Sequence, residues 1–275
     1  MALTVRTNLS AMRAYHSLNE NQNALGGTLN RISTGLRVVQ AADDAAGLGV
    51  ATNLNAQSNS LDQAMRNAND GISIIQTAEG AANEVTNILN RMRELSIQSS
   101  SETLANSERA YINDEFNQLN LEINRIAEVT EFNGIQLGNG STSTISAQIG
   151  IDNNADSRID ILIGDLRATV LGIGTATDLS SSTGARAAID AIDSAIAAVS
   201  GYRSNLGAVQ NRLDSSLSNS TNYMESLDAA ASQIMDADFA KESTEMTKQQ
   251  IMQQAGVASL AQAKNINQAV TSLLN

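Results

Sequence analysis

Few residues of this chain could carry out chemistry, and none of them stands in the pattern of a catalytic or metal site. His16 is the single histidine, and neither a cysteine nor a paired carboxylate lies at metal-ligand spacing from it. We therefore interpret His16 as an ordinary surface or seam histidine. The chain has no cysteine, which excludes disulfides, thiol catalysis and thiolate metal ligands.

Two further motifs resemble functional sites but have simpler structural explanations. Asp43 and Asp44 are adjacent carboxylates just before an apolar run that resumes at Ala45, where either acid could cap a helix and complement its dipole. Gly47 and Gly49 suggest a phosphate-binding loop, but the segment lacks the lysine and the preceding strand that such a loop needs. We interpret these glycines as a place where helices approach closely. Helical seams seldom form a concave pocket, so we expect no enzyme activity and no cofactor.

A polar cluster contains Arg91, Arg93 and Glu94, together with Asp114 and Glu115 further along the chain. One interpretation is a solvated helix face with weak ion pairs. The other is a recognition surface, which needs more support than charge. Composition alone favours the solvated face.

Composition excludes several classes of partner. The formal net charge is -12 and the sequence pI is about 4.5, so the chain should repel nucleic acid and anionic membranes. No run of about 18 apolar residues is present, and we therefore expect no membrane insertion. Residues 1–10 lack the apolar core of a cleaved secretory signal peptide.

Hydrophobic residues recur every seven positions in both halves of the chain, as in helices that bury one apolar seam against a neighbour. The rows are Leu54, Leu61, Ala68, Ile75, Ala82 and Leu89 in the first half, and Ile192, Val199, Leu206, Leu213 and Leu227 in the second. Two seams so far apart in the sequence predict antiparallel pairing. The absence of proline is consistent with long helices.

The periodicity predicts a mainly α fold, a long antiparallel helical bundle or coiled coil with a small β-hairpin region. The expected helices cover residues 1–36, 45–100, 106–128, 184–231 and 239–274. Between residues 134 and 184 glycines accumulate and the helical period is lost. Residues 145–151 and 159–163 alternate between apolar and polar around an Asp/Asn-rich turn, which predicts a β-hairpin.

Five blocks of the sequence closely resemble segments of the bacterial flagellins. They are LNRISTGLRVVQAADDAAGL (29–48), RMRELSIQS (91–99), LEINRIAEVTEFNGIQL (121–137), SNLGAVQNRL (204–213) and IMQQAGVASLAQA (251–263). The match extends over nearly the whole chain in the same order, so it is far more specific than any single motif above.

The resemblance implies a structural subunit that polymerises into the flagellar filament for swimming motility. It implies export of the unfolded chain through the flagellar type III system without a cleaved signal peptide, and an extracellular location in the filament. The implied partners are further copies of the chain in a helical homopolymer, a flagellar export chaperone, and the cap and junction proteins.

By the same resemblance the chain divides into five segments. Residues 1–40 and 236–275 are expected to be the inner-tube helices, residues 41–137 and 181–235 the helical outer-tube domain, and residues 138–180 a β-hairpin with a reduced variable region. The expected inner-tube seam consists of Leu18, Leu25, Leu29, Ile32, Met252, Ile266, Val270 and Leu273. The chain thus resembles a short flagellin that lacks the large outer domains.

Two kinds of surface site are also implied. Some flagellins are bound by the innate immune receptor TLR5, and the matching positions here are Arg91, Leu95 and Glu115, which would otherwise serve axial packing between subunits. Family members are often O-glycosylated, and the exposed candidates are Ser141, Thr142, Ser143, Thr144, Ser180, Ser181, Ser182 and Thr183.

Two alternatives remain open from the sequence. A hook-filament junction protein would share the terminal helices, although the intact ADDAAGL and EFNGIQL blocks favour the filament subunit. A cytosolic coiled-coil adaptor would instead be a soluble dimer with ordered ends.

Overall fold

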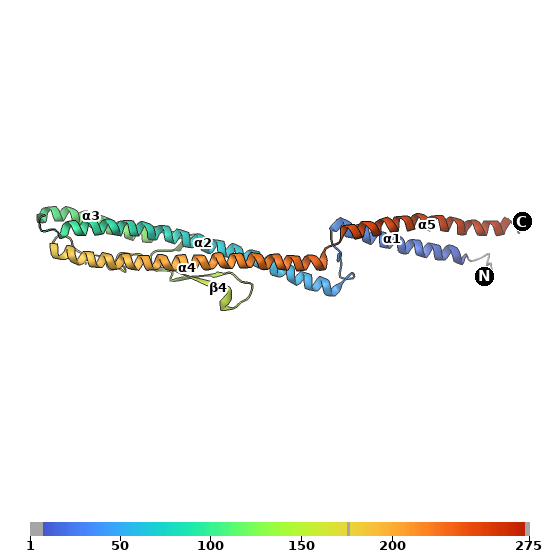
Figure 1. Ribbon diagram of the computed structural model, residues 1–275, viewed down its shortest axis with the longest axis horizontal. Coiled ribbons are helices and arrows are strands. Elements are labelled where there is room, and N and C mark those ends of the chain that lie inside the picture. Colours follow the sequence, from blue (N-terminus) through green and yellow to red (C-terminus); the bar gives the residue numbers. More distant parts are fainter. Residues whose placement is uncertain (1–7, 175–176, 273–275) are drawn as a thin grey trace. The chain divides into compact units, whose positions relative to one another are not determined.

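The computed structural model describes residues 8–174 and 177–272, with side chains described through residue 265 of the last helix (Figure 1). It confirms a mainly α fold with two small antiparallel sheets. The helices are α1 (Leu9–Thr34), α2 (Ala45–Ser100), α3 (Asn106–Val129), α4 (Ser182–Met235) and α5 (Phe239–Ser272). The strands are β1 (Glu131–Phe132), β2 (Ile135–Gln136), β3 (Thr144–Gln148) and β4 (Arg158–Leu162), and a 3₁₀ turn (Ala155–Ser157) precedes β4.

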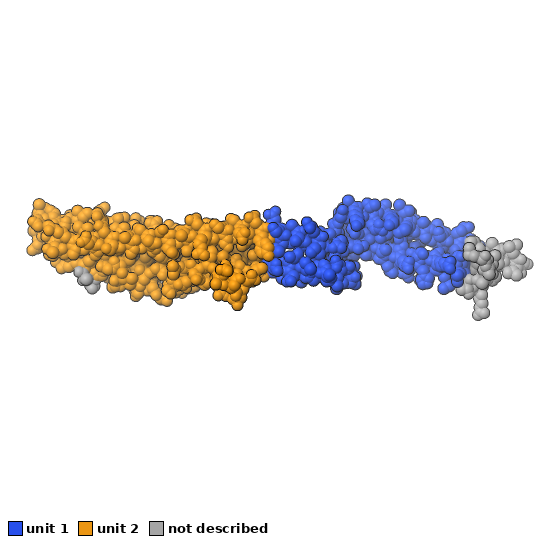
Figure 2. All heavy atoms as spheres, turned by 60° about the horizontal axis from the view of Figure 1, so that its bottom comes forward, with its two compact units in different colours: residues 1–58, 225–275 blue, residues 59–224 orange. Residues whose placement is uncertain are grey.

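The chain forms two compact units, which Figure 2 shows in blue and orange. Residues 1–58 and 225–275 make up the first, called here the terminal unit, and residues 59–224 make up the second, called the central unit. Helices α2 and α4 each contribute to both units. The expected division into five segments stays a prediction.

The predicted heptad rows form the core of the central unit. From Leu61 to Leu89 on α2, and from Ile192 to Leu213 on α4, every member of the two rows is at most 3% exposed. Phe116 and Ile123 of α3 are fully buried against the same cluster. Three helices therefore share one apolar interior, which accounts for the seven-residue spacing in the sequence.

Ion pairs between α2 and α4 show that the two helices run antiparallel within the central unit. Glu79 pairs with Arg203 at 3.6 Å, and Arg93 pairs with Asp193 at 2.6 Å. As α2 advances by fourteen residues, its partner on α4 moves back by ten, as antiparallel helices require. The pairing predicted from the two seams is confirmed here.

The predicted hairpin is formed by β3 and β4, which pair from Thr144 with Leu162 to Gln148 with Arg158. Their inward side chains pack on α2 and α4, where a Cβ at Gly71 would lie 3.4 Å from both Ile161 Cδ1 and Leu213 Cδ1. Sequence periodicity did not predict the second hairpin, β1 with β2. Its strands have two residues each, too short to alternate visibly, and positive φ angles at Asn133 (48°) and Gly134 (78°) make the tight turn.

Capping residues define the ends of two helices in the terminal unit. Helix α1 ends at Gly35, whose φ of 73° is the left-handed conformation that glycine adopts most readily. Helix α2 begins after Asp44, whose Oδ1 accepts a hydrogen bond from the backbone N–H of Gly47 at 2.8 Å. Asp44, rather than Asp43, is therefore the helix cap, and Asp43 Oδ2 instead accepts bonds from the preceding loop, from the backbone N–H groups of Val39 and Gln40.

Gly47 and Gly49 provide a test of this cap. A Cβ at position 47 would lie 2.3 Å from Asp44 Oδ2 and 3.2 Å from Ile234 Cγ2, whereas a Cβ at position 49 meets nothing within 4 Å. We expect Gly49→Ala to stabilise the start of α2 by up to about 1 kcal/mol through helix propensity. We expect the Gly47→Ala variant to be less stable than the Gly49→Ala variant by about 1 kcal/mol or more, because the added Cβ displaces the Asp44 cap.

Amide hydrogen exchange of residues 45–58 measures this local stability in both variants. Equal protection in the two variants would contradict the close approach at Gly47.

Candidate interaction surfaces

The contact between α1 and α5 in the terminal unit contains polar side chains where a helix pair usually buries apolar ones. Thr28 is 0% exposed and Gln249 is 4% exposed. Asn21 Nδ2 donates to the backbone carbonyl of Gln249 at 2.8 Å, and Arg31 Nε lies 3.4 Å from Glu242 Oε2. Polar residues at seam positions reduce the stability of a helix pair.

Large apolar side chains of the same two helices are instead exposed. They are Leu9, Met12, Tyr15 and Leu29 on α1, and Phe239, Ile251, Met252 and Val257 on α5, each between 44% and 68% exposed. Single exposed apolar residues are ordinary, but this many on two adjacent helices mark an interaction surface.

The expected inner-tube seam is only partly enclosed in the subunit. Leu18, Leu25 and Ile32 are half-buried between the helices, whereas Leu29 is 48% and Met252 is 44% exposed. Residues Ile266, Val270 and Leu273 of the expected seam lie outside the described side chains. Beside Leu18 and Met252 the helices leave an apolar groove of about 480 Å³.

The polar cluster of the central unit separates into two parts. Arg91 Nε and Nη2 donate to Glu115 Oε1 at 3.0 and 2.8 Å, and Arg91 Nη1 donates to Glu94 Oε2 at 3.0 Å. These hydrogen bonds, first of all those to Glu115, raise the pKa of Arg91. Arg93 points elsewhere, to Asp193 of α4. Arg91 and Glu115 are therefore brought together at the surface of the central unit.

Leu95 is not part of that surface. It is 1% exposed and belongs to the core shared by α2, α3 and α4. Leu95 follows Arg91 by about one helical turn. Four residues correspond to about 400° of rotation, so Leu95 lies about 40° further around α2 than Arg91, on the side that faces the core. Leu95 can only support the charged pair from beneath.

The hydroxyl candidates differ in their availability. Ser141, Ser143, Thr144 and Thr183 are exposed, whereas Thr142 and Ser182 are partly covered. Ser180 Oγ donates to Asp178 Oδ2 at 2.7 Å, and this hydrogen bond holds the pKa of Asp178 below its usual value. Ser181 Oγ accepts from the backbone N–H of Gly184 at 3.1 Å and caps α4. Modification of Ser180 or Ser181 would therefore disturb local structure.

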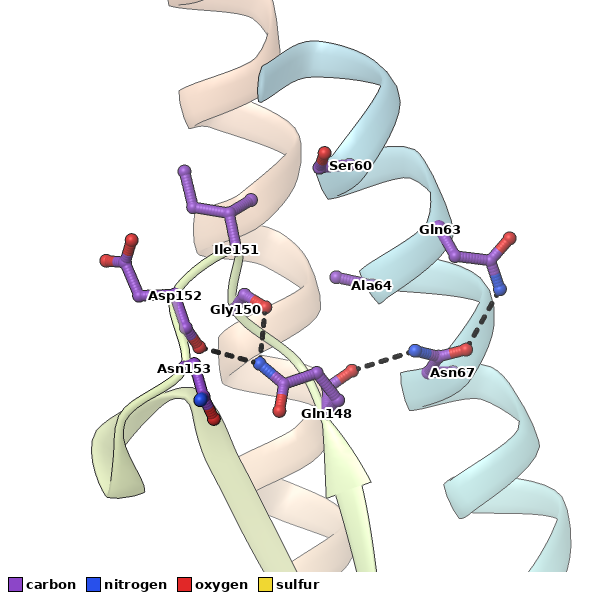
Figure 3. Close-up of a pocket in the computed structure, with 9 residues that line it drawn as sticks. All are labelled: Ser60, Gln63, Ala64, Asn67, Gln148, Gly150, Ile151, Asp152 and Asn153. Carbon is purple, nitrogen blue, oxygen red and sulfur yellow. Dashed lines mark hydrogen bonds between the residues drawn. The ribbon is translucent and has the colours of Figure 1, made fainter. Parts of the chain in front are cut away.

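A polar pocket of about 400 Å³ lies between α2 and the turn that joins β3 to β4 (Figure 3). In Figure 3, Asn67 Nδ2 donates to the backbone carbonyl of Gln148, and Gln148 Nε2 donates to the carbonyls of Gly150 and Asp152. The side-chain amides are thus engaged in holding the turn together and against α2. Asp152 is the single titratable group in the lining, so the pocket offers no acid-base pair for catalysis.

The last candidates for chemistry are His16 and the acidic side chains that could bind a metal. His16 is exposed and stacks edge-on against Tyr15, with ring centroids 6.4 Å apart. Within the described residues, no three His, Cys, Asp or Glu side chains group around a possible metal position. No helix in that part of the chain has both the length and the apolar content needed to span a membrane.

Sequence reasoning missed the polar layer between α1 and α5, because it searched the heptads for apolar residues alone. The missed signal is the occupation of regular seam positions by polar side chains. On α1 the half-buried or buried positions are 11, 14, 18, 21, 25, 28, 31 and 32, and Asn21, Thr28 and Arg31 are the polar residues among them.

Two family models together match most of the chain. The bacterial flagellin N-terminal helical region matches residues 5–143, and the bacterial flagellin C-terminal helical region matches residues 189–274. Neither model includes residues 144–188, which contain β3, β4 and the start of α4.

Relatives that match this chain over their full length are also flagellins. A flagellin of Halalkalibacterium halodurans is 45% identical over 272 residues, which cover 99% of this chain and 100% of that protein. A flagellin of Treponema pallidum is 38% identical, with 99% and 100% covered. Polar flagellin C of Vibrio parahaemolyticus, 36% identical with both chains fully covered, aligns over 383 positions. That alignment exceeds the 275 residues of this chain by more than a hundred, so this chain is a short form.

Solved structures show the same fold. Flagellin from Bacillus cereus has a TM-score of 0.51 and 31% identity, with 56% of this chain and 88% of that chain covered. A flagellar hook-associated protein from Vibrio parahaemolyticus has a TM-score of 0.60, with 70% and 100% covered. At 15% identity, the second likeness concerns the fold alone.

Arg91 and Leu95 should differ sharply in their effect on the isolated subunit. Leu95→Ala should destabilise the central unit by about 2–5 kcal/mol, because it leaves a cavity in a packed core. Arg91→Ala should leave the urea midpoint almost unchanged, because its ion pairs are half exposed to solvent. Equal shifts of the two midpoints would contradict the separation into core and rim.

Proposed function

The chain belongs to the flagellin family and is a structural subunit of the bacterial flagellar filament; on this premise we propose that α1 and α5 form the inner tube of the filament. Its role is structural rather than catalytic. In this proposal residues 1–40 and 236–275 line the inner tube, and the central unit with its hairpin belongs to the outer tube.

The outward apolar side chains of α1 and α5 carry the proposal. Tyr15 is 58%, Phe239 is 68% and Ile251 is 61% exposed, while Thr28 and Gln249 are enclosed between the two helices. The apolar side chains on the outside of this helix pair can be buried only against another molecule. Further copies of this chain are the partner that a homopolymer supplies.

This arrangement couples folding of the ends to assembly. Helices α1 and α5, with 26 and 34 residues, depend for most of their stability on the packing of an apolar face. Burial of the outward rows by neighbouring subunits would supply that support and stabilise the helical state by mass action. The terminal helices would therefore become fully ordered only as the subunit joins the filament.

Export fits the same picture. We propose that the unfolded chain passes through the flagellar type III system without a cleaved signal peptide, accompanied by an export chaperone, and then meets the cap and junction proteins. Two features of the composition support this route. The chain has neither cysteine nor proline, so no disulfide and no slow prolyl isomerisation delays refolding outside.

For the central unit we propose that Arg91 and Glu115 make axial contacts between subunits and a secondary contact with the receptor TLR5. They lie on two adjacent helices with about half of each side chain exposed, at 50% and 47%. A bidentate arginine at the surface is a common anchor of protein interfaces. Leu95 would act by fixing α2 beneath them.

The exposed hydroxyls remain proposed sites of O-glycosylation, with Ser141, Ser143, Thr144 and Thr183 the most accessible. Because the region between the two family matches is short, we expect a thinner and smoother filament than that of longer relatives. The hook-filament junction alternative is not favoured, because the relatives that match over their full length are flagellins.

A lysine-specific endoprotease tests the inner-tube proposal, since all three lysines of the chain, Lys241, Lys248 and Lys264, lie in α5. We expect rapid cleavage of the monomer and strong protection in filaments grown from seeds. Leu260→Pro, which costs about 3 kcal/mol or more within a helix, should abolish filaments and the protection with them.

Leu260→Met is the matched control, because it keeps the helix and the apolar volume and should still polymerise. Cleavage of wild-type filaments as fast as monomers would place α5 at an accessible surface and sink the inner-tube assignment. Monomer ends as resistant as the central unit would contradict ordering on assembly.

Arg91→Ala should weaken both receptor signalling by the soluble subunit and filament growth. Arg93→Ala is the control, because Arg93 bonds to Asp193 of α4 instead. The double reversal Arg91→Glu with Glu115→Arg preserves the internal ion pair but presents reversed charges to a partner, so signalling should remain lost. Normal signalling by soluble Arg91→Ala would remove the receptor contact from the proposal.

A further inference from the structure

Polar contacts at three levels connect α1 to α5. Asn8 Nδ2 donates to the carbonyl of Ala263 at 2.8 Å, Asn21 Nδ2 donates to that of Gln249 at 2.8 Å, and Arg31 approaches Glu242 at 3.4 Å. The two sequence numbers in each pair add up to nearly the same value, as expected for one antiparallel register along the whole helix pair.

The two inner levels are enclosed. Thr28 and Gln249 are almost fully buried, and the Arg31 and Glu242 side chains are 33% and 13% exposed. Asn21 Oδ1, Thr28 Oγ1 and Gln249 Oε1 are buried without a hydrogen-bond partner among the described residues. Apolar residues of similar volume would stabilise the helix pair more than polar groups that lack some of their hydrogen bonds. Stability alone therefore does not explain why this seam contains such polar groups.

The apolar part of the same seam contains both small and large side chains. Ala11 and Ala14 of α1, and Gly256 and Ala263 of α5, are small, whereas Leu18, Leu25 and Ile32 are larger and half-buried, and Leu18 Cδ1 lies 3.3 Å from where a Cβ at Gly256 would stand. A shift of one heptad would place Leu18 over Ala263, another small residue. Register in helix pairs of this kind is commonly specified by one polar pair at a seam position.

A shift of seven residues would separate Arg31 from Glu242. In one direction Asn21 would face Gly256 and Arg31 would face Gln249, which leaves Glu242 without its cation. In the other direction Asn21 would face Glu242, and Arg31 would pass the first turn of α5. Asn21 Nδ2 could donate to a backbone carbonyl of α5 in either alignment, as it does at Gln249, so the ion pair is the contact that depends on register.

We propose that the Arg31–Glu242 contact, called here the register layer, determines the axial register of α1 against α5 when the filament assembles. This inference rests on the proposed function, in which the two helices remain paired in the filament. The register layer sets the axial position of the outward apolar side chains of one helix relative to those of the other. One heptad of error would displace them by about 10 Å and misalign the contacts with every neighbouring subunit.

Disulfide formation can report the register, because the chain contains no cysteine of its own. A Cβ at Gly256 would lie 4.0 Å from Leu18 Cβ, within the range of about 3.5–4.5 Å that disulfides need. Leu18→Cys with Gly256→Cys therefore reports the native register. Leu18→Cys with Ala263→Cys reports a shift of one heptad.

Filaments of each cysteine pair are oxidised, and intramolecular cross-links are quantified by mass spectrometry. With the register layer intact, we expect the native-register cross-link to exceed the shifted one at least tenfold. In Arg31→Leu/Glu242→Leu we expect the ratio to approach one. Asn23→Leu is the matched control, because Asn23 is exposed on the same helix and should leave the ratio unchanged.

A charge series gives an independent test if the leucine variant does not polymerise. Arg31→Glu should lower the ratio at least threefold, and Arg31→Glu with Glu242→Arg should restore it. A ratio unchanged by Arg31→Glu, or by Arg31→Leu/Glu242→Leu where it assembles, would overturn the register layer. Absence of the native-register cross-link in otherwise wild-type filaments would instead overturn the proposed pairing of α1 and α5.

Discussion

The structure depends on one constraint, that a long helix with an apolar stripe must have that stripe covered. Apolar burial contributes roughly 25 cal/mol per Å², and it is the main favourable term available to a chain with 3% aromatic residues and no disulfides. Secondary structure alone cannot support helices of 24 to 56 residues. Each helix therefore needs a neighbour, either from the same chain or from another copy.

The two units meet this constraint in different ways. In the central unit α2, α3 and α4 cover one another, and the loop after β4 adds Leu166, Ile173 and Leu179 to the same interior. In the terminal unit the residues enclosed between α1 and α5 include Thr28 and Gln249 beside the half-buried Leu18, Leu25 and Ile32, and other large apolar side chains face outward. The central unit can complete its core alone, whereas the terminal helices need further subunits to bury theirs.

The sequence predicted the fold well where each helix is covered by another helix of the same chain. The heptad rows from Leu61 to Leu89 and from Ile192 to Leu213 predicted the helices and their pairing, because every buried position repeats with the helix period. The hairpin of β3 and β4 followed from strict alternation. The sequence pattern did not predict the shortest elements. Strands β1 and β2 have two residues each and depend on the turn at Asn133 rather than on a pattern.

The sites were less predictable, because a contact between helices depends on angles that a linear motif does not contain. Arg91 and Glu115 meet across α2 and α3, but Leu95 turns into the core. The seam of α1 and α5 was expected to be apolar, and the search for hydrophobic heptads passed over Asn21 and Gln249. Three-dimensional pairing was needed to reveal that the Asn21 side chain donates to the backbone carbonyl of Gln249.

Under the proposed function, a polar seam also accounts for how the subunit can remain unassembled until it meets a growing filament. Each buried polar group without a partner costs about 1–3 kcal/mol, and Asn21, Thr28 and Gln249 each have one such atom. A wholly apolar seam would close in the isolated chain and would tolerate several registers. A polar seam makes the pair weak alone but selective in alignment, and burial of Tyr15, Phe239 and Ile251 against neighbours can then stabilise the correctly aligned state. Weak pairing in the monomer and accurate packing in the polymer thus follow from the same few residues.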